Sequence, residues 1–428
     1  MALTVDQVLA LAPDPAAAAA GRKLASGSSW QSLGESSAAY WGECRGSAVY
    51  QVRVDRGDLA SKCSCPSRKF PCKHALGLLL LAAGKPLPET AAPQWVSEWL
   101  EKRNAPKPMA KAGTPDPQAQ AKRSEKRAER VLAGLDLLDL WLADLARAGL
   151  ATLDESSFAR MAARLVDAQA SGLASRVRRI GELVGGAPSW PSLVLDELGL
   201  LALLSHAFRR LESLDAPLRN DLRQMIGFTM EKEEVVAAGD RVLDAWAVIG
   251  QQAYEDERFR SQRTWLHGAQ SKRTALVLQF AAGRAAFPEA LLPGSRIDAE
   301  LAFWPGANPQ RAMIFERHAV HPSFGDRLPG FDDAESFLSE AANALSRQPW
   351  LDRLCCPLRA AVPFSSQDGF LLRDAKGAVL PLSGLDHWKL LALSGGRPVD
   401  VAGEWDGRRL YPLSAIANGG FHSLRSET

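Results

Sequence analysis

Hydrophobic and polar residues change their spacing several times along the chain, and each change predicts a different kind of element. Residues 1–35 carry apolar side chains at helical spacing, which predicts short helices. Between residues 40 and 55, apolar Tyr50, Val52 and Val54 alternate with polar residues, a pattern typical of a half-buried strand. The turn between two such strands is predicted at Gly42, Gly46 and Ser47.

Helical spacing returns further along the chain. The apolar run from Ala75 to Leu81 predicts a buried helix that ends at Gly84. A continuous apolar seam then steps by four, three, four and three residues through Val131, Leu135, Leu138, Leu142 and Leu145. A second helix is predicted from Phe158, Met161, Leu165 and Val166, and a long one from Leu193 to Leu214. Together these predict a small helical bundle.

From about Val242 the pattern is that of short strands, several of them bounded by glycine or proline. Strands are predicted at Trp246–Ile249, Ala275–Leu278, Ile297–Trp304, Met313–Phe315, Val399–Trp405 and Leu410–Leu413. A capped helix is predicted from Asp332 to about Arg347, and a hairpin has its turn at Asp374 to Gly377. The C-terminal region is therefore expected to be mixed and β-rich.

These patterns predict an α+β, multidomain protein. Four segments are expected: a finger module at 1–100, a flexible basic linker at 101–118, a helical bundle at 119–237 and a mixed β-rich domain at 238–428. Residues 101–130 carry nine Lys or Arg against four Asp or Glu, a net charge of +5. Basic residues near the start of the bundle could share one helix face, although Glu125 and Glu129 interrupt them and favour a solvated face: Lys122, Arg123, Lys126, Arg127 and Arg130.

Composition narrows the class of protein. With 428 residues, 46% of them hydrophobic and a net charge of +2, the chain is of ordinary globular type, and a wholly basic surface is not expected. Six cysteines are too few for a disulfide scaffold. The N-terminus lacks the pattern of a signal peptide, and no long uncharged apolar stretch predicts a spanning helix. We expect a cytoplasmic protein that does not enter a membrane.

Three of the six cysteines gather in one short segment with a histidine. Cys63, Cys65, Cys72 and His74 form the pattern C-x-C, six residues, C-x-H. Three thiolates and one imidazole supply the tetrahedral ligand set of a structural zinc site. Because all four ligands come from the protein, no position is left open for catalysis. Unligated cysteines, or a redox dithiol of Cys63 and Cys65, are the alternatives.

The charges around this segment favour the same interpretation. Lys62, Arg68, Lys69 and Lys73 lie between Ser61 and His74 without an acidic residue, and nearby cations favour thiolates. The same cations predict a positive surface around the finger. We expect one structural Zn²⁺ per chain.

The residues from Trp41 to Ser47, then Tyr50 to Val52, then Cys63 to Leu81 resemble the SWIM zinc finger, in particular its bacterial form. Cys63, Cys65, Cys72 and His74 fill that family's C-x-C, C-x-H pattern without departure. The resemblance implies zinc binding by a finger that engages DNA or protein partners. It also suggests an adaptor working with a MoxR-type AAA ATPase, because bacterial members are often encoded beside one.

The other cysteines and histidines carry no comparable signal. Cys44 is interpreted as a buried packing residue, with a fifth thiol near the metal as the alternative. The adjacent Cys355 and Cys356 are interpreted as packing residues, and His318 and His321 lack further ligands nearby in the sequence. No phosphate-binding loop, metalloprotease, serine hydrolase or dinucleotide-binding motif is present. An active site without such a motif in the β-rich region remains an alternative, but we expect a protein that is not an enzyme.

Two functions are therefore compared. The first is a zinc-binding, non-enzymatic adaptor that engages protein partners through its finger and C-terminal modules. The second is a nucleic-acid (DNA) binding protein that uses the basic finger and linker. The near-neutral total charge and the missing catalytic motifs favour the first.

Overall fold

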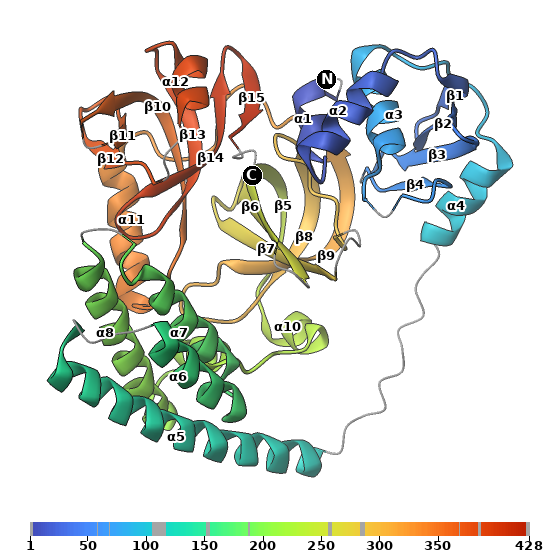
Figure 1. Cartoon of the computed structure of the whole chain (residues 1–428). Helices are drawn as coiled ribbons and strands as arrows, with labels where there is room; N and C mark the ends of the chain where they lie inside the picture. The colour runs from blue at the N-terminus through green and yellow to red at the C-terminus, as the bar shows by residue number, and fades with distance from the viewer. Residues whose placement is uncertain are drawn as a thin grey trace.

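The computed structural model of the chain describes residues 3–57, 59–67, 69–104, 117–150, 155–186, 189–255, 259–282, 287–367, 369–383 and 387–424. Most of the predicted linker, residues 105–116, lies outside the described residues. The predicted α+β class is confirmed: a finger module, a helical bundle and a strand-rich C-terminal region follow one another (Figure 1). The strands predicted at 238–428 form two separate sheets, a closed barrel and an open sheet.

The N-terminal module is a four-stranded antiparallel sheet with helices on both faces. Leu76, Leu78 and Leu79 of α3 are fully buried in the core that the helix shares with α1, α2 and the sheet. On the other face, Trp41 packs against Val96 of α4. The elements are α1 (Val5–Ala10), α2 (Pro15–Leu24), β1 (Trp30–Glu35), β2 (Ala39–Arg45), β3 (Val49–Asp55), β4 (Ser61–Cys63), α3 (Lys73–Gly84) and α4 (Gln94–Asn104).

Two predictions for this module are wrong. Residues Trp30–Glu35 were expected to be helical but form strand β1, which pairs with β2 because Trp30 is buried there against the helices. Gly42 was expected in a turn but lies inside β2. A side chain at Gly42 would come within 2.7 Å of Leu33 and 2.9 Å of Trp30, so close packing explains the glycine.

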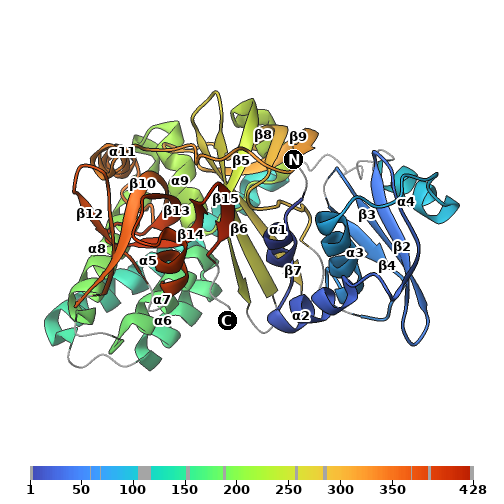
Figure 2. The ribbon, with the colours of Figure 1, turned by 90° about the horizontal axis from the view of Figure 1, so that it is seen from above.

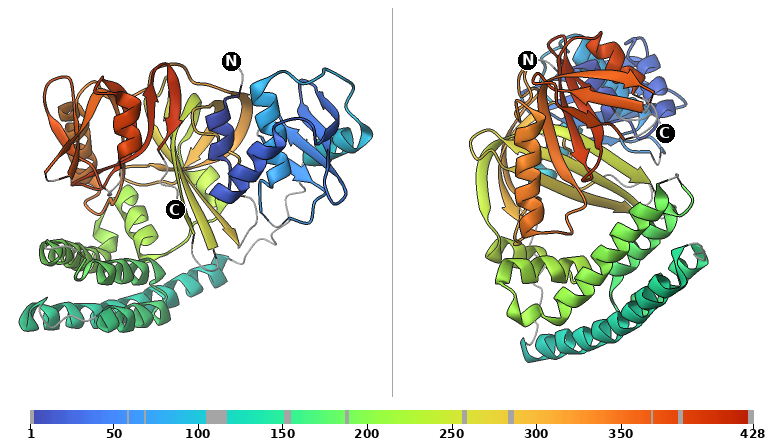
Figure 3. Two further views of the ribbon diagram at one scale, coloured as in Figure 1. Left: turned by 45° about the horizontal axis from the view of Figure 1, so that its top comes forward. Right: turned by 90° about the vertical axis from the view of Figure 1, so that its left-hand side faces the viewer.

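The helical bundle lies beneath the barrel and the C-terminal sheet, with the long helix α5 on its outer side (Figures 1 and 3). The predicted seam of α5 packs into its core, with Val131, Leu135 and Leu138 fully buried. Val166, one of the apolar residues that predicted the second helix, is exposed. The elements are α5 (Pro117–Ala148), α6 (Glu155–Asp167), α7 (Ser171–Leu183), α8 (Trp190–Arg209), the short 3₁₀ helix Leu211–Ser213, α9 (Ala216–Ile226) and α10 (Lys232–Ala238).

Helix α8 is the single helix in the described part of the chain that is long and apolar enough to cross a membrane, by length and composition alone. It also packs within the bundle. Its side chains at Val194, Leu198, Leu201 and Leu204 lie in the bundle core.

Five strands form a closed barrel in the order β5-β6-β7-β9-β8. The long first strand pairs with both the second and the fourth, and the third pairs in parallel with the fifth. This is the Greek-key arrangement of OB-fold barrels. The strands are β5 (Arg241–Glu255), β6 (Phe259–Gly268), β7 (Thr274–Ala282), β8 (Arg296–Phe303) and β9 (Arg311–His321).

The second C-terminal body is a six-stranded antiparallel sheet in the order β12-β11-β10-β13-β14-β15, covered by α11 and α12. The predicted capped helix is present as α11, with Asp333 as its N-cap. The elements are α11 (Ala334–Arg347), β10 (Leu354–Ser366), β11 (Gly369–Arg373), β12 (Val379–Pro381), α12 (Trp388–Ser394), β13 (Val399–Trp405), β14 (Leu410–Ala417) and β15 (Gly420–Ser423).

Specific polar contacts join these bodies. Seen from above, the barrel lies between the finger module and the C-terminal sheet (Figure 2). The side chain of Gln7 in α1 donates to the carbonyl of Pro322, 2.7 Å away, just after β9. On the opposite side, fully buried Glu404 of β13 accepts from Trp265 Nε1 at 2.8 Å and from Arg263 at 2.7 Å, both on β6.

Candidate metal centre

Two neighbouring elements bring the four predicted ligands together. Cys63 ends strand β4, and Cys65 lies in the loop that follows. Cys72 is the N-cap of α3, and His74 lies in the first turn of that helix. The core packing of α3 against the sheet fixes the distance between the two elements, so both halves of the site are held before any ion binds.

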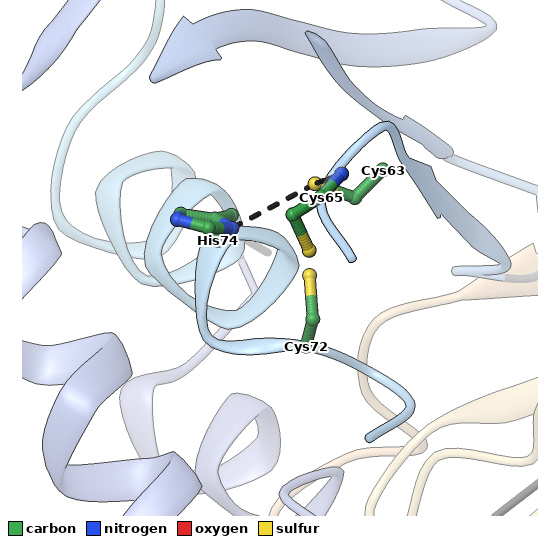
Figure 4. A group of neighbouring side chains, drawn as sticks. All are labelled: Cys63, Cys65, Cys72 and His74. Carbon is green, nitrogen blue, oxygen red and sulfur yellow. Dashed lines mark hydrogen bonds between the residues drawn. The ribbon is translucent and has the colours of Figure 1, made fainter. Parts of the chain in front are cut away.

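The four donor atoms all lie within 4.8 Å of one another. The Sγ of Cys63 is 3.7 Å from Nδ1 of His74, and the sulfurs of Cys65 and Cys72 face each other (Figure 4). A tetrahedral zinc with Zn–S and Zn–N bonds of about 2.3 and 2.1 Å places its ligands about 3.6 to 3.8 Å apart. The donor set and its spacing therefore fit a zinc ion without rearrangement of the backbone.

The pKa values of the three thiols are shifted in different directions. The pKa of the Cys72 thiol is lowered to about 4, chiefly by its hydrogen bond with Cys63 and further by His74. The pKa of Cys63 is raised by the same hydrogen bond and by burial, and burial raises that of Cys65. One thiolate is thus already favoured at the helix N-terminus, and metal binding would release the protons of the others.

The surroundings limit the movement of the site. Cys72 and His74 are buried, whereas Cys63 and Cys65 are partly exposed. The ring of Tyr50 on β3 packs against the imidazole of His74, with ring centroids 4.9 Å apart. Alternation along β3 predicted that Tyr50 would be half-buried, but no spacing in the sequence indicated its contact with the ligand.

The cations around the finger are less free than their spacing suggested. The ammonium of Lys69 lies 2.6 Å from a carboxylate oxygen of Asp14 at the start of α2. Lys62 and Lys73 are exposed, and Arg68 lies outside the described residues. Asp14 is more than fifty positions away in the sequence, so the local count of charges missed this ion pair.

The remaining cysteines are buried and do not belong to the ligand cluster. Within the described residues, one group of three or more Cys, His, Asp and Glu side chains is arranged to hold a metal, and it contains neither Cys44 nor Cys355. Cys44 is fully buried in the finger core. Cys355 and Cys356 point to opposite faces of β10, and each packs in a different hydrophobic cluster.

The fold and this site define a class of zinc-finger protein in which a hairpin and a helix supply a closed Cys₃His set. Family models confirm this class and make it specific: the SWIM zinc finger matches residues 50–83, and the SWIM-associated four-helix bundle domain matches residues 126–226. The predicted resemblance to the SWIM zinc finger family is thus confirmed over these two segments of the chain. Neither the curated proteins nor the solved structures gave a match to it.

Proposed function

We propose that this protein is a non-enzymatic, zinc-stabilised adaptor that binds protein partners. The observation that supports it is a set of leucines on the outer surface of the bundle. Leu140 of α5 is 59% exposed and Leu195 of α8 is 62% exposed. Leu137 and Leu203 are each 42% exposed, one turn or two turns away on the same helices.

Exposed leucines in rows are a feature of protein-binding surfaces. Single exposed apolar residues are common, but repeated ones along a helix expose apolar area that a partner can cover. Leu195 and Leu203 are eight residues apart, with Gly199 between them, so they lie on one side of α8. The other face of α8 is committed to the bundle core.

Zinc has a structural role in this proposal. One Zn²⁺ per chain would be held by Cys63, Cys65, Cys72 and His74, joining β4 to α3. Because the protein supplies all four ligands, the ion has no open position at which a substrate could bind. Metal analysis should give about one zinc per chain, and Cys72→Ser should lower it. A purified protein without zinc would overturn this part of the proposal.

Protein binding is favoured over DNA binding at the finger by the charges there. The ammonium of Lys69 is paired with the carboxylate of Asp14, 2.6 Å away. The finger therefore offers fewer free cations to phosphates than its sequence suggests. A MoxR-type AAA ATPase is the partner class that the family resemblance suggests.

The test is affinity purification of the full chain from its native host. A co-purifying protein, an AAA ATPase in the expected case, should be present in stoichiometric amount. It should be lost with Leu195→Gln and Leu203→Gln combined. It should be retained with the matched control, Ser192→Gln and His206→Gln, two exposed residues of the same helix.

Two results would contradict the adaptor. The first is that no protein co-purifies in stoichiometric amount. The second is that the partner binds the leucine double variant as strongly as the wild type. The folded state of each variant is checked by circular dichroism, so that loss of binding is not confused with unfolding.

A further inference from the structure

Three adjoining cavities lie along the helical bundle, and one of them also reaches the barrel at Trp304 and Arg311. Their volumes are about 370, 310 and 600 Å³. The first two share Gln224 and Phe228, and the last two share Ser171. We call this continuous depression the arginine groove; its cationic side chains are Lys126, Arg127, Arg130, Arg223 and Arg311.

These cations come from three separate elements. Lys126, Arg127 and Arg130 belong to α5, Arg223 belongs to α9, and Arg311 begins strand β9 of the barrel. In the part of the chain that the structure describes, the two cavities that meet at Ser171 have no acidic residue in their lining. Glu231 and Glu234 line the first cavity alone. The groove is thus positively charged along most of its length.

Aromatic rings hold the guanidinium groups in place. Arg311 lies over Trp304, with the guanidinium carbon 4.2 Å from the ring centroid. Arg127 and Arg223 lie 4.2 and 4.5 Å from the ring of Phe228. Stacking on a ring orients a guanidinium plane without neutralising its charge.

The three arginines lack counter-charges. Among the described residues, no carboxylate lies within 4.0 Å of any of their guanidinium nitrogens, although the chain has many other such pairs. Arg127 donates to the carbonyls of Gln169 and Gly227, at 3.1 and 2.8 Å. Burial lowers the pKa of Arg311, and burial together with Arg223 lowers that of Arg127. A bound anion would relieve this unfavourable concentration of positive charge.

Uncharged donors lie between the arginines. Helix α7 begins in the groove at Ser171 and Gly172, and its N-cap, Ala170, offers no side chain to its first N–H groups. Backbone N–H groups that no side chain caps can bind phosphate oxygens. Side-chain donors complete the lining: Gln169, Ser171, Thr229 and the second amide proton of Gln224, whose first is donated to the Pro305 carbonyl.

The barrel contributes the segment that OB folds use for oligonucleotides. In such barrels, ligands bind on the face of the second and third strands and at the loops after the first and fourth strands. Here the C-terminal sheet partly covers that face, since Trp265 of β6 donates a hydrogen bond to buried Glu404 of β13. The loop after the fourth strand runs from Trp304 to Gln310, and its flanking Trp304 and Arg311 line the groove.

We propose that the arginine groove binds single-stranded nucleic acid through its phosphodiester backbone, without sequence preference. The lining consists of the donors that contact phosphates in protein–nucleic acid complexes: guanidiniums, hydroxyls, amides and a helix N-terminus. Bases of a single strand are unpaired and can stack on the ring-backed guanidinium planes of Arg223 and Arg311, which the stacked bases of a duplex cannot do.

Fluorescence anisotropy of the full-length, zinc-loaded protein tests this. The probe is a labelled oligothymidylate of about 20 nucleotides, titrated from about 50 to about 200 mM salt. Arg223→Gln combined with Arg311→Gln should weaken binding at least about tenfold. It should also reduce the slope of log affinity against log salt by about 1.4, since each single-strand phosphate contact contributes about 0.7. The matched control is Arg164→Gln with Arg178→Gln, two exposed arginines elsewhere on the bundle.

A second variant guards against misfolding. Lys126→Gln with Arg130→Gln removes two exposed positive charges from α5, and neither side chain stacks on an aromatic ring in the described part of the chain. This double variant should therefore weaken binding without affecting the fold. The proposal is overturned if the wild type does not bind the probe at about 50 mM salt. It is equally overturned if both groove variants bind like the control, or if Lys62→Gln with Lys73→Gln at the finger abolishes binding instead.

Competition identifies the ligand more closely. Unlabelled single strand should displace the probe, whereas duplex of equal length and ATP should compete at least about tenfold less well. Equal competition by duplex or by ATP would overturn the assignment to a single strand. Because the bundle leucines are not part of the groove, loss of nucleic-acid binding would leave the adaptor proposal unaffected.

Discussion

Replacing Asp221 by Asn should stabilise the protein at alkaline pH. Asp221 lies on α9, is only 6% exposed, and accepts the backbone N–H of Ala307 at 2.8 Å. Ala307 belongs to the loop after β8, so this carboxylate helps to hold the barrel loop against the bundle at the arginine groove. Burial raises its pKa from 3.8 to about 6.

The direction in which stability changes with pH follows from how tightly the folded and the unfolded protein bind the Asp221 proton. The folded protein holds the Asp221 proton more tightly than the unfolded chain does, so the stability linked to this group is present below pH 3.8 and is lost as the pH rises through about 6. The difference between these two pKa values corresponds to at most about 3 kcal/mol. The asparagine amide must itself be buried at this site, so we expect Asp221→Asn to gain about 1 to 2 kcal/mol at pH 8, less than this upper bound.

The assay is urea unfolding at about pH 8 and about pH 5, followed by tryptophan fluorescence. Asparagine keeps an oxygen that can accept the Ala307 N–H, so only the charge is removed. The gain should fall by about half at the lower pH, where folded Asp221 is mostly protonated. Asp326→Asn, an exposed carboxylate, is the control and should change stability little at either pH. The reasoning is refuted if Asp221→Asn is destabilising at pH 8, or if its gain is the same at both values.

Three further substitutions test close contacts, two of them between bodies and one within the finger module. Gly306→Ala would place a methyl group 2.1 Å from Asp221 Oδ1, so it should cost about 1 to 3 kcal/mol in urea unfolding, and an unchanged midpoint would contradict this. Arg263→Met should lower the free energy of unfolding by about 3 kcal/mol, because the buried Glu404 carboxylate is then left with Arg353, 3.7 Å away, as its cationic partner. The effects of Arg263→Met and Glu404→Gln should be strongly non-additive in a double-mutant cycle, and additive losses would contradict the ion pair. Gly77→Ala should lower the melting temperature despite alanine's higher helix propensity, because its Cβ would lie 2.8 Å from a side chain of α2; a higher melting temperature would show that α2 can move aside.

The finger ligands could be predicted from the sequence because the chemistry is local. Cys63 and His74 are eleven positions apart, and one loop brings them together, so spacing alone indicated the metal set. The pairing of Asp14 with Lys69 could not be predicted this way, because it depends on how α2 packs on α3. Charge counts along a segment therefore described the finger less well than its ligand spacing did.

One strand of the barrel, unlike the zinc ligands, could not be predicted from local sequence. Strand β6 was not predicted, because the apolar–polar alternation that reveals a half-buried strand fails there. Gln262 and Thr264 point into the barrel, where Thr264 accepts a hydrogen bond from Gln251, while Trp265 points out and is covered by the C-terminal sheet. A strand buried on both faces, with polar residues inside, leaves no period for the sequence to show.

The arginine groove was missed for a third reason, and that reason bears on how the modules work together. Arg127, Arg223 and Arg311 are spread over 185 positions of the chain, and the sequence favoured a solvated face for the first of them. Neither the bundle nor the barrel alone contains the groove, because α9 supplies Arg223 and β9 supplies Arg311. Contacts such as Asp221 with Ala307 and Gln224 with Pro305 hold the two walls in register. A bundle fixed in this way beside the barrel loop supplies one wall of the groove, while Leu140 and Leu195 on its helices remain exposed.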